Sequence, residues 1–229
     1  MTNIPALTAA NAARWKAMHT IASLGPTLDA VAGRLIAAPA KARYEAVSGA
    51  TKVPWYVIAV IHEREASQKW NTQLGQGDPL DRVSVHVPAG RGPFKTWEDG
   101  AYDALVNCAP YAARNQDWSV GGLLTILELY NGLGYFAHGA PSPYVWSGTD
   151  QYHSGKYVRD GVFDPNVVDA QLGCAGLLMA MAQLDKTIVM GAIQPTALPT
   201  QPPVVKPSPA PSIWASLLSG FLSIFKKGK

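Results

Sequence analysis

The sequence predicts an α+β fold that is mainly α-helical, with a small β-hairpin and a C-terminal amphipathic helix. Long alanine- and leucine-rich segments carry helical periodicity and cap signals, and residues 83–87 alternate apolar and polar side chains as a strand does. At 229 residues, 48% of them hydrophobic, the chain can bury one core with an appendage. We therefore expect a domain over residues 1–193, a proline-rich linker over 194–212 and a tail over 213–229.

The first part of the domain reads as scaffold. The segment from Ala6 to about Ser48 is rich in Ala, Leu and Arg and is broken at Gly25-Pro26, which predicts two helices; Thr27 or Asp29 can cap the second. Residues 1–11 have neither a basic start nor a long apolar run, so no secretory signal is expected. We expect synthesis and folding in a cytoplasm.

The segment after Pro54 holds the candidate chemistry. Proline suits a first helical turn, and the apolar run behind it predicts a buried helix to about Ser67. At about 100° per residue Glu65 continues the face formed by Ile58 and Ile61. Glu63 points to roughly the opposite face, beside an arginine that we expect to be solvated. The two glutamates are therefore not equivalent.

A carboxyl group at the end of an apolar stripe is a candidate general acid. Desolvation raises its pKa and keeps a proton available near neutral pH. The alternative is that Glu65 is an ordinary residue at a helix end, paired with Arg64 or Lys69.

Residues 75–92 follow this helix and predict a short strand or hairpin, because Val83 to Val87 alternate. Asp78 and Asp81 lie in this segment. Either can face Glu65 as a second carboxylate that holds or activates water. The alternative for Asp78 is a simple turn residue.

Two further helices have clear start signals. Thr96-Trp-Glu-Asp99 fits a capping box and begins a helix that Pro110 ends. Ser119 can cap a helix over 121–130 that stops at Asn131-Gly132. Tyr130 and Asn131 therefore come to a helix end, where side chains can line a cleft.

The segment 132–163 is long, irregular and aromatic, and such loops in compact domains are usually functional. Aromatic rings offer apolar faces to sugars, and Tyr144 and Trp146 are our preferred substrate contacts. The alternative is a satellite core under the loop. Asp164-Pro165 then predicts the start of a final helix to about Lys186, with small residues for close packing.

The tail, 213–229, has apolar residues at helical spacing and lysines behind them. It is too short to span a bilayer and reads as an interfacial helix that binds a bacterial membrane, although docking on the domain's own surface stays open. The expected membrane-binding residues are Trp214, Leu218, Phe221, Phe225, Lys226 and Lys227.

Composition and spacing exclude other kinds of site. The net charge of +3 is mild and the basic residues are scattered, so no nucleic-acid surface is expected, while an anionic wall suits this balance. His62-Glu63-Arg64-Glu65-Ala66 begins like a zinc-protease helix, but Ala66 stands where a second histidine is needed. No metal or cofactor is expected, and we expect a monomer.

The two cysteines, Cys108 and Cys174, lie in apolar surroundings, which favours buried free thiols. A disulfide between them stays open.

Two motifs resemble a known family. Glu65-Ala-Ser67, followed by Trp70-Asn71, resembles the Glu-Ser-x-Phe-Asn signature of lytic transglycosylases and goose-type lysozymes, with one extra alanine. Leu129-Tyr130-Asn131-Gly132 resembles their downstream Tyr-Asn-x-Gly motif.

The closer likeness, over residues 53–171, is to phage-type endolysins of the lysozyme superfamily. It covers His-x-Arg-Glu-Ala-Ser, Gly-Asp-Pro-Leu, His-Val-Pro-Ala-Gly, Tyr-Asn-Gly-x-Gly-Tyr and Ser-Pro-Tyr-x-Trp. The resemblance implies a lysozyme-like domain that acts on peptidoglycan between N-acetylmuramic acid and N-acetylglucosamine. It also implies synthesis in a host cytoplasm, with action in the periplasm and cell wall only after release. It also implies Glu65 as the acid, Asp78 as the preferred second carboxylate, and Ser67, Tyr130 and Asn131 as substrate-binding residues.

The chemistry of the second step stays open at this point. The aspartates favour hydrolysis, whereas the Tyr-Asn-Gly element favours attack by the substrate's own hydroxyl and an anhydro product. Rival functions are a non-catalytic wall-binding module, a protein that disrupts membranes through its tail, and a chitinase- or chitosanase-like enzyme.

Overall fold

A computed structural model describes residues 3–191, which fall within the expected domain. This part is mainly helical with one small antiparallel sheet, so the predicted α+β class is confirmed. No helix within it is long and apolar enough to cross a membrane. The expected linker and the tail with its membrane-binding residues from Trp214 to Lys227 lie outside the described residues. The helices are α1 (Ile4–Ala17), α2 (Gly25–Ile36), α3 (Ala38–Thr51), α4 (Trp55–Ala66), α5 (Trp97–Val106), α6 (Val120–Asn131), α7 (Gly134–Ala137), α8 (Pro143–Trp146) and α9 (Cys174–Leu184), and the strands are β1 (Lys156–Arg159) and β2 (Val162–Asp164).

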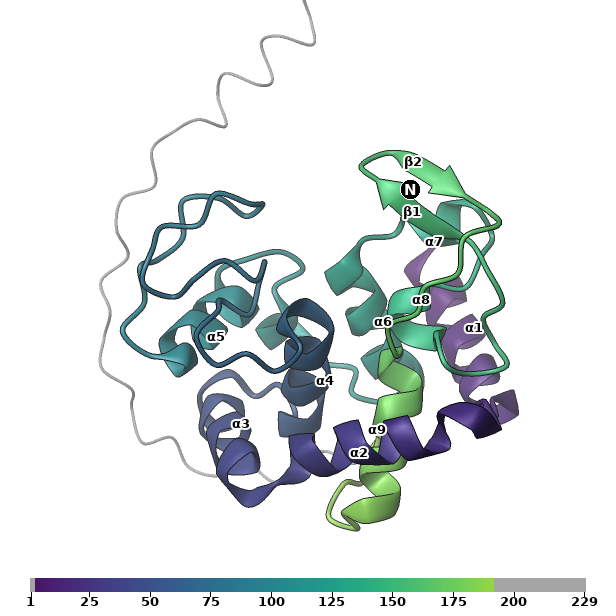
Figure 1. The fold of residues 1–229 in the computed structure, drawn as a ribbon, viewed down its shortest axis with the longest axis horizontal. Helices are drawn as coiled ribbons and strands as arrows, with labels where there is room; N and C mark the ends of the chain where they lie inside the picture. Colours follow the sequence, from purple (N-terminus) through teal and green to yellow (C-terminus); the bar gives the residue numbers. More distant parts are fainter. Residues whose placement is uncertain (1–2, 192–229) are drawn as a thin grey trace, which may run out of the picture. The chain divides into compact units, whose positions relative to one another are not determined.

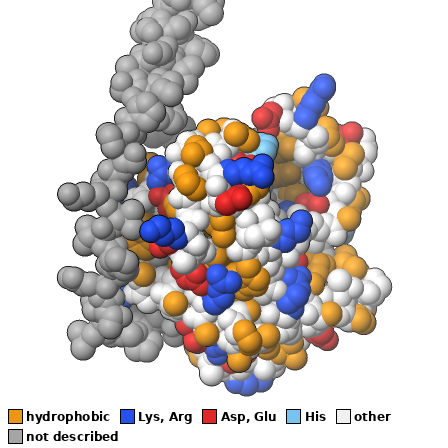
Figure 2. Space-filling view, turned by 60° about the vertical axis from the view of Figure 1, so that its left-hand side comes forward, with side chains coloured by type: hydrophobic (Ala, Val, Ile, Leu, Met, Phe, Trp, Pro, Cys, Tyr) orange, Lys and Arg blue, Asp and Glu red, His pale blue; other side chains and the backbone are white. Residues whose placement is uncertain are grey.

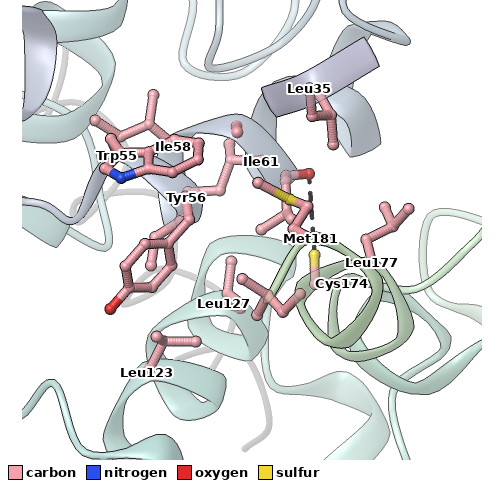
Figure 3. Packing of buried hydrophobic residues seen from close by; sticks show 14 of the residues in the cluster. Leu35, Trp55, Tyr56, Ile58, Ile61, Leu123, Leu127, Cys174, Leu177 and Met181 are labelled. Carbon is pink, nitrogen blue, oxygen red and sulfur yellow. Dashed lines mark hydrogen bonds between the residues drawn. The ribbon is translucent and has the colours of Figure 1, made fainter. Parts of the chain in front are cut away.

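Helix α4 is the centre of the core, as the apolar run after Pro54 predicts. Every side chain from Trp55 to His62 is buried. The helix lies between α3 and α5 on one side and α6 and α9 on the other (Figure 1). Figure 3 shows side chains from α4, α6 and α9 meeting in this core. Both cysteines are free and buried, and the Cys174 thiol lies 4.0 Å from the carbonyl oxygen of Val60.

The N-terminal scaffold has three helices instead of the two expected. Ala37 has an extended backbone and separates α2 from α3. Pro39 explains the break, because its ring and missing N–H prevent a helix from continuing through it but are tolerated in a first turn. Helix α2 starts at Gly25 after Leu24, without a side-chain cap, so the expected caps Thr27 and Asp29 are wrong.

The helix starts at Thr96 and Ser119 are confirmed. Thr96 and Asp99 form a reciprocal capping box on α5, and the Ser119 hydroxyl accepts a hydrogen bond from the N–H of Gly122 on α6. Helix α5 ends at Val106, before the proline that was expected to end it. Local side-chain chemistry determines these helix starts, so the sequence is sufficient to find them.

The expected hairpin at residues 83–87 is wrong. Val83, Val85 and Val87 are exposed, with Val85 at 77%, so the alternating pattern buries no apolar face. The backbone bonds locally instead: the N–H of Ser84 donates to the carbonyl of Arg91. The segment is therefore a loop.

The hairpin lies later in the chain, where β1 pairs with β2 and Lys156 lies opposite Asp164. Asp164 therefore ends a strand and does not cap the final helix, as was expected. Helix α9 begins at Cys174 after Gly173. A Cβ on Gly173 would lie 2.6 Å from the backbone of Ser147, so only glycine allows this close approach.

Gly121 allows α6 to pack tightly on α1, and its replacement by alanine is expected to destabilise the fold. An added Cβ would lie 2.7 Å from the carbonyl oxygen of Thr8 and 3.1 Å from the Cβ of Ala12. We expect the free energy of unfolding to fall by about 2 kcal/mol, since overpacking exceeds the gain of about 1 kcal/mol in helix propensity. Urea denaturation measures this. Gly49→Ala on α3, which meets nothing within 4 Å, is the control and should not destabilise.

Candidate active site

Glu65 lies in the last turn of α4 and is partly buried. The helix ends at Ser67, which adopts a left-handed conformation and whose side chain is exposed. Burial raises the pKa of the Glu65 carboxyl to about 7, while a hydrogen bond and a nearby positive charge oppose this. Glu65 is therefore protonated in a large fraction of the molecules at neutral pH.

Tyr144 on α8 holds this carboxyl in place. Its hydroxyl donates a hydrogen bond to Oε1 of Glu65 at 2.9 Å, which stabilises the carboxylate and lowers its pKa. The ring itself is buried, and burial raises the pKa of Tyr144 well above its ordinary value. The side chain that was expected to contact substrate therefore contacts the candidate acid directly.

Tyr130, in the last turn of α6, belongs to the same cluster. Its hydroxyl is buried and has no hydrogen-bond partner among residues 3–191. Burial, and then the charge of Glu65, raise its pKa well above the ordinary value. The neighbouring Asn131 is exposed at the end of the same helix. Three helices thus bring Glu65, Tyr130 and Tyr144 together.

Glu63 lies on the expected face of α4, whereas Arg64 differs from expectation. Glu63 does point away from this cluster and forms an ion pair with Arg34 at 2.9 Å. Arg64, however, is not solvated: its side chain is 6% exposed and pairs with Asp169 at 3.1 Å. The alternative in which Arg64 is the salt-bridge partner of Glu65 is therefore not realised, although its charge lowers the Glu65 pKa.

Asp78 is buried, and loop contacts occupy its carboxylate. Oδ2 accepts hydrogen bonds from the N–H groups of Val85 and His86, at 2.9 and 3.0 Å, and Oδ1 lies 2.7 Å from Nδ1 of His86. The hydrogen bonds from His86 are the main cause of the lowered pKa of the Asp78 carboxyl. Within the described chain Asp78 makes no hydrogen bond to Glu65. These hydrogen bonds indicate that Asp78 stabilises the loop that contains Val85 and His86.

Asp81 and Trp146 are not arranged for the roles considered for them. The Asp81 side chain is 79% exposed and lies 3.6 Å from Arg82. Trp146 is 0% exposed in the core, so its ring offers no face to a sugar. Other rings of this segment form a half-buried cluster on the surface nearby. His138 stacks on Phe163 at 4.4 Å, and both lie against Tyr157 of β1.

An open pocket of about 700 Å³ lies apart from the Glu65 cluster. At this pocket Trp70 is covered by the guanidinium of Arg43 at 4.1 Å, and Arg43 is held by Glu98. We place the candidate chemistry at Glu65 and not here, because Asp81 in this pocket is exposed and the hydrogen bond from Arg43 holds the pKa of Glu98 below its ordinary value. The lining residues are Arg43, Trp70, Asn71, Pro79, Leu80, Asp81, Arg82, Lys95, Thr96, Trp97 and Glu98.

The surface is also hollowed beside the hairpin, and apolar side chains line this hollow (Figure 2). Among residues 3–191 no group of three or more His, Cys, Asp or Glu side chains could hold a metal ion.

The buried Arg64–Asp169 pair could not be predicted from the sequence, since the two residues lie far apart in the chain and no local motif links them. A scan against models of known protein families found no match, and neither did searches of curated proteins and of solved structures.

Proposed function

We propose that this protein cleaves the glycosidic bond between N-acetylmuramic acid and N-acetylglucosamine in peptidoglycan, with Glu65 as the general acid. The observation that carries the proposal is the Glu65 carboxyl, whose pKa of about 7 comes from burial and whose position is held by the Tyr144 hydroxyl. An acid with a pKa near the working pH is what protonation of a leaving oxygen needs. The substrate class and the lysozyme-like character of the domain rest on the endolysin resemblance.

Each cluster residue has a task in this reaction. Glu65 transfers its proton to the leaving oxygen, and the carboxylate that remains keeps the Tyr144 hydrogen bond and the nearby charge of Arg64. The Tyr130 hydroxyl is buried without a partner in residues 3–191, so it can bind a polar group of the sugar once the substrate displaces the side chains that cover it. Asn131 and Ser67, both exposed at adjacent helix ends, supply further polar contacts.

Attack by the substrate's own hydroxyl is the better supported second step: its oxygen bonds to the anomeric carbon as the leaving oxygen departs, and its proton passes to the Glu65 carboxylate, which restores the acid. Hydrolysis needs a carboxylate that activates water opposite the acid. The Asp78 oxygens already bind Val85 and His86, and Asp81 lies exposed beside Arg82. The expected product is therefore an anhydro muropeptide.

Mass spectrometry of soluble products from purified peptidoglycan tests the proposal. Wild-type protein is expected to release disaccharide peptides whose mass is lower by one water. Products of full mass would show that the protein cleaves peptidoglycan by hydrolysis, and would reject the anhydro route. Release of sugars from chitin but not from peptidoglycan would indicate the chitinase-like alternative, and no release from either polymer would reject the proposed activity.

A non-catalytic wall-binding protein is the second candidate, and the pocket at Trp70 favours it. The pocket has a volume of about 700 Å³ and places an aromatic ring beside charged side chains. Such a pocket can bind a peptidoglycan fragment without catalysing a reaction. Under this alternative Glu65→Gln would sediment with purified peptidoglycan as the wild type does, and neither protein would release products.

A further inference from the structure

Arg64 makes three hydrogen bonds and one ring contact in the interior, while its Nε is buried without a hydrogen-bond partner in residues 3–191. Nη1 donates hydrogen bonds to the carbonyl oxygens of Gln171 and Leu172, at 3.1 and 3.2 Å, and Nη2 donates to Oδ2 of Asp169 at 3.1 Å. The guanidinium also lies over the Tyr144 ring, 4.8 Å from its centroid. Burying a guanidinium is costly unless its donors are satisfied, and here most of them are.

The contacts run in both directions between α4 and the segment after the hairpin. The side-chain amide of Gln171 donates to the carbonyl oxygen of Arg64 at 2.8 Å. Asp169 also accepts a hydrogen bond from Lys156 of β1 at 3.0 Å, and its N–H donates to the hydroxyl of Tyr152. The last turn of α4 is thereby fastened to residues 169–171 and, through Lys156, to the hairpin.

We propose that Arg64 is a positioning residue for the reaction: fixed by residues 169–172, its guanidinium holds the Tyr144 ring so that the Tyr144 hydroxyl meets the Glu65 carboxyl. The inference rests on the proposed role of Glu65 as the acid. A planar fork with fixed donors can bind two carbonyls, a carboxylate and a ring face together. A lysine cannot, because it lacks this planar fork.

Four groups face the Glu65 carboxyl from the elements packed around it. They are Arg64 on its own helix, Tyr130 of α6, Tyr144 of α8 and Cys174 of α9. Arg64 is the positive one, and its charge lowers the Glu65 pKa directly. The Tyr144 hydrogen bond lowers it as well, so loss of Arg64 removes both effects and the pKa should rise.

The test follows the Glu65 carboxyl by carbon-13 NMR titration in the full chain, with Glu65→Gln to assign the signal. Arg64→Met is expected to raise the midpoint by about one pH unit. The alkaline limb of peptidoglycan cleavage should move up equally, because a general acid works only while protonated. We also expect kcat to fall about tenfold or more with little change in KM, since the substrate contacts remain.

Arg34→Met is the matched control. Arg34 also binds the C-terminal end of α4, through Glu63 and through Gln68 just beyond the helix. Its side chain is 42% exposed, so Arg34→Met should lose less stability than Arg64→Met, and it should leave the Glu65 midpoint unchanged. An unchanged midpoint in folded Arg64→Met, or an equal shift in Arg34→Met, would overturn the inference.

Arg64→Lys keeps the test decisive if Arg64→Met does not fold. Lysine retains the charge but not the planar fork, so the aromatic NMR signals of Tyr144 should shift and kcat should fall. Unchanged Tyr144 signals and unchanged kcat would reject the positioning role. Absence of cleavage by the wild type would reject the proposed function, and the titration and the Tyr144 signals, which need no activity, would separately show whether Arg64 holds Tyr144 against Glu65.

Discussion

Glu65→Gln is expected to reduce release of soluble muropeptides from purified peptidoglycan by about 1,000-fold. General acid catalysis contributes roughly 10²–10⁴-fold, and glutamine has no proton to transfer. The amide is nearly the same shape and can still accept the Tyr144 hydrogen bond, so the fold and the cluster should persist. Turbidity loss combined with mass spectrometry of products measures the change.

Glu63→Gln is the matched control for this prediction. It makes the same chemical change two residues earlier on the same helix, at a carboxylate that pairs with Arg34. Its activity should stay within a few-fold of the wild type. If Glu63→Gln lost activity while Glu65→Gln retained it, the assignment of the two faces of α4 would be reversed.

Glu65→Gln should also stabilise the protein above neutral pH. The carboxyl has a pKa of about 7 in the fold, against an ordinary value of 4.5, so the folded state holds more protons between these values. Wild-type stability therefore falls as pH rises through this window. At about 1.36 kcal/mol per pH unit the upper bound is roughly 3 kcal/mol, and partial exposure reduces it to about 2 kcal/mol at pH 8.

Urea denaturation at pH 4 and pH 8 separates this effect from a general change in stability. The difference between Glu65→Gln and the wild type should be small at pH 4 and favour the variant at pH 8. Glu63→Gln should not be more stable at pH 8, because it loses the Arg34 ion pair. A variant equally stable with the wild type at both values would contradict the burial of Glu65.

The features predictable from the sequence are those that a few neighbouring residues determine. Pro54 and the apolar run behind it determine α4, and helical periodicity places Glu65 at the end of its buried face. Thr96 and Ser119 determine their helix starts through side-chain caps. The pKa of Glu65 follows from the same periodicity, since burial is its main cause.

The features that the sequence could not settle depend on distant partners. Residues 83–87 have the alternation of a strand, but no covering layer buries their valines, and Asp78 binds the loop backbone instead. Trp146 lies in an aromatic segment whose exposed and buried members look alike in sequence, and it proves fully buried. Arg64 meets Asp169 across 105 positions, a contact that only the tertiary fold creates.

A direct titration of the Glu65 carboxyl in the wild-type protein, compared with the pH dependence of peptidoglycan cleavage, tests the central claim most directly. The carboxyl should titrate near pH 7, and cleavage should decline over the same pH range as the acid loses its proton. A midpoint near the ordinary 4.5, with cleavage persisting well above it, would show that another group donates the proton.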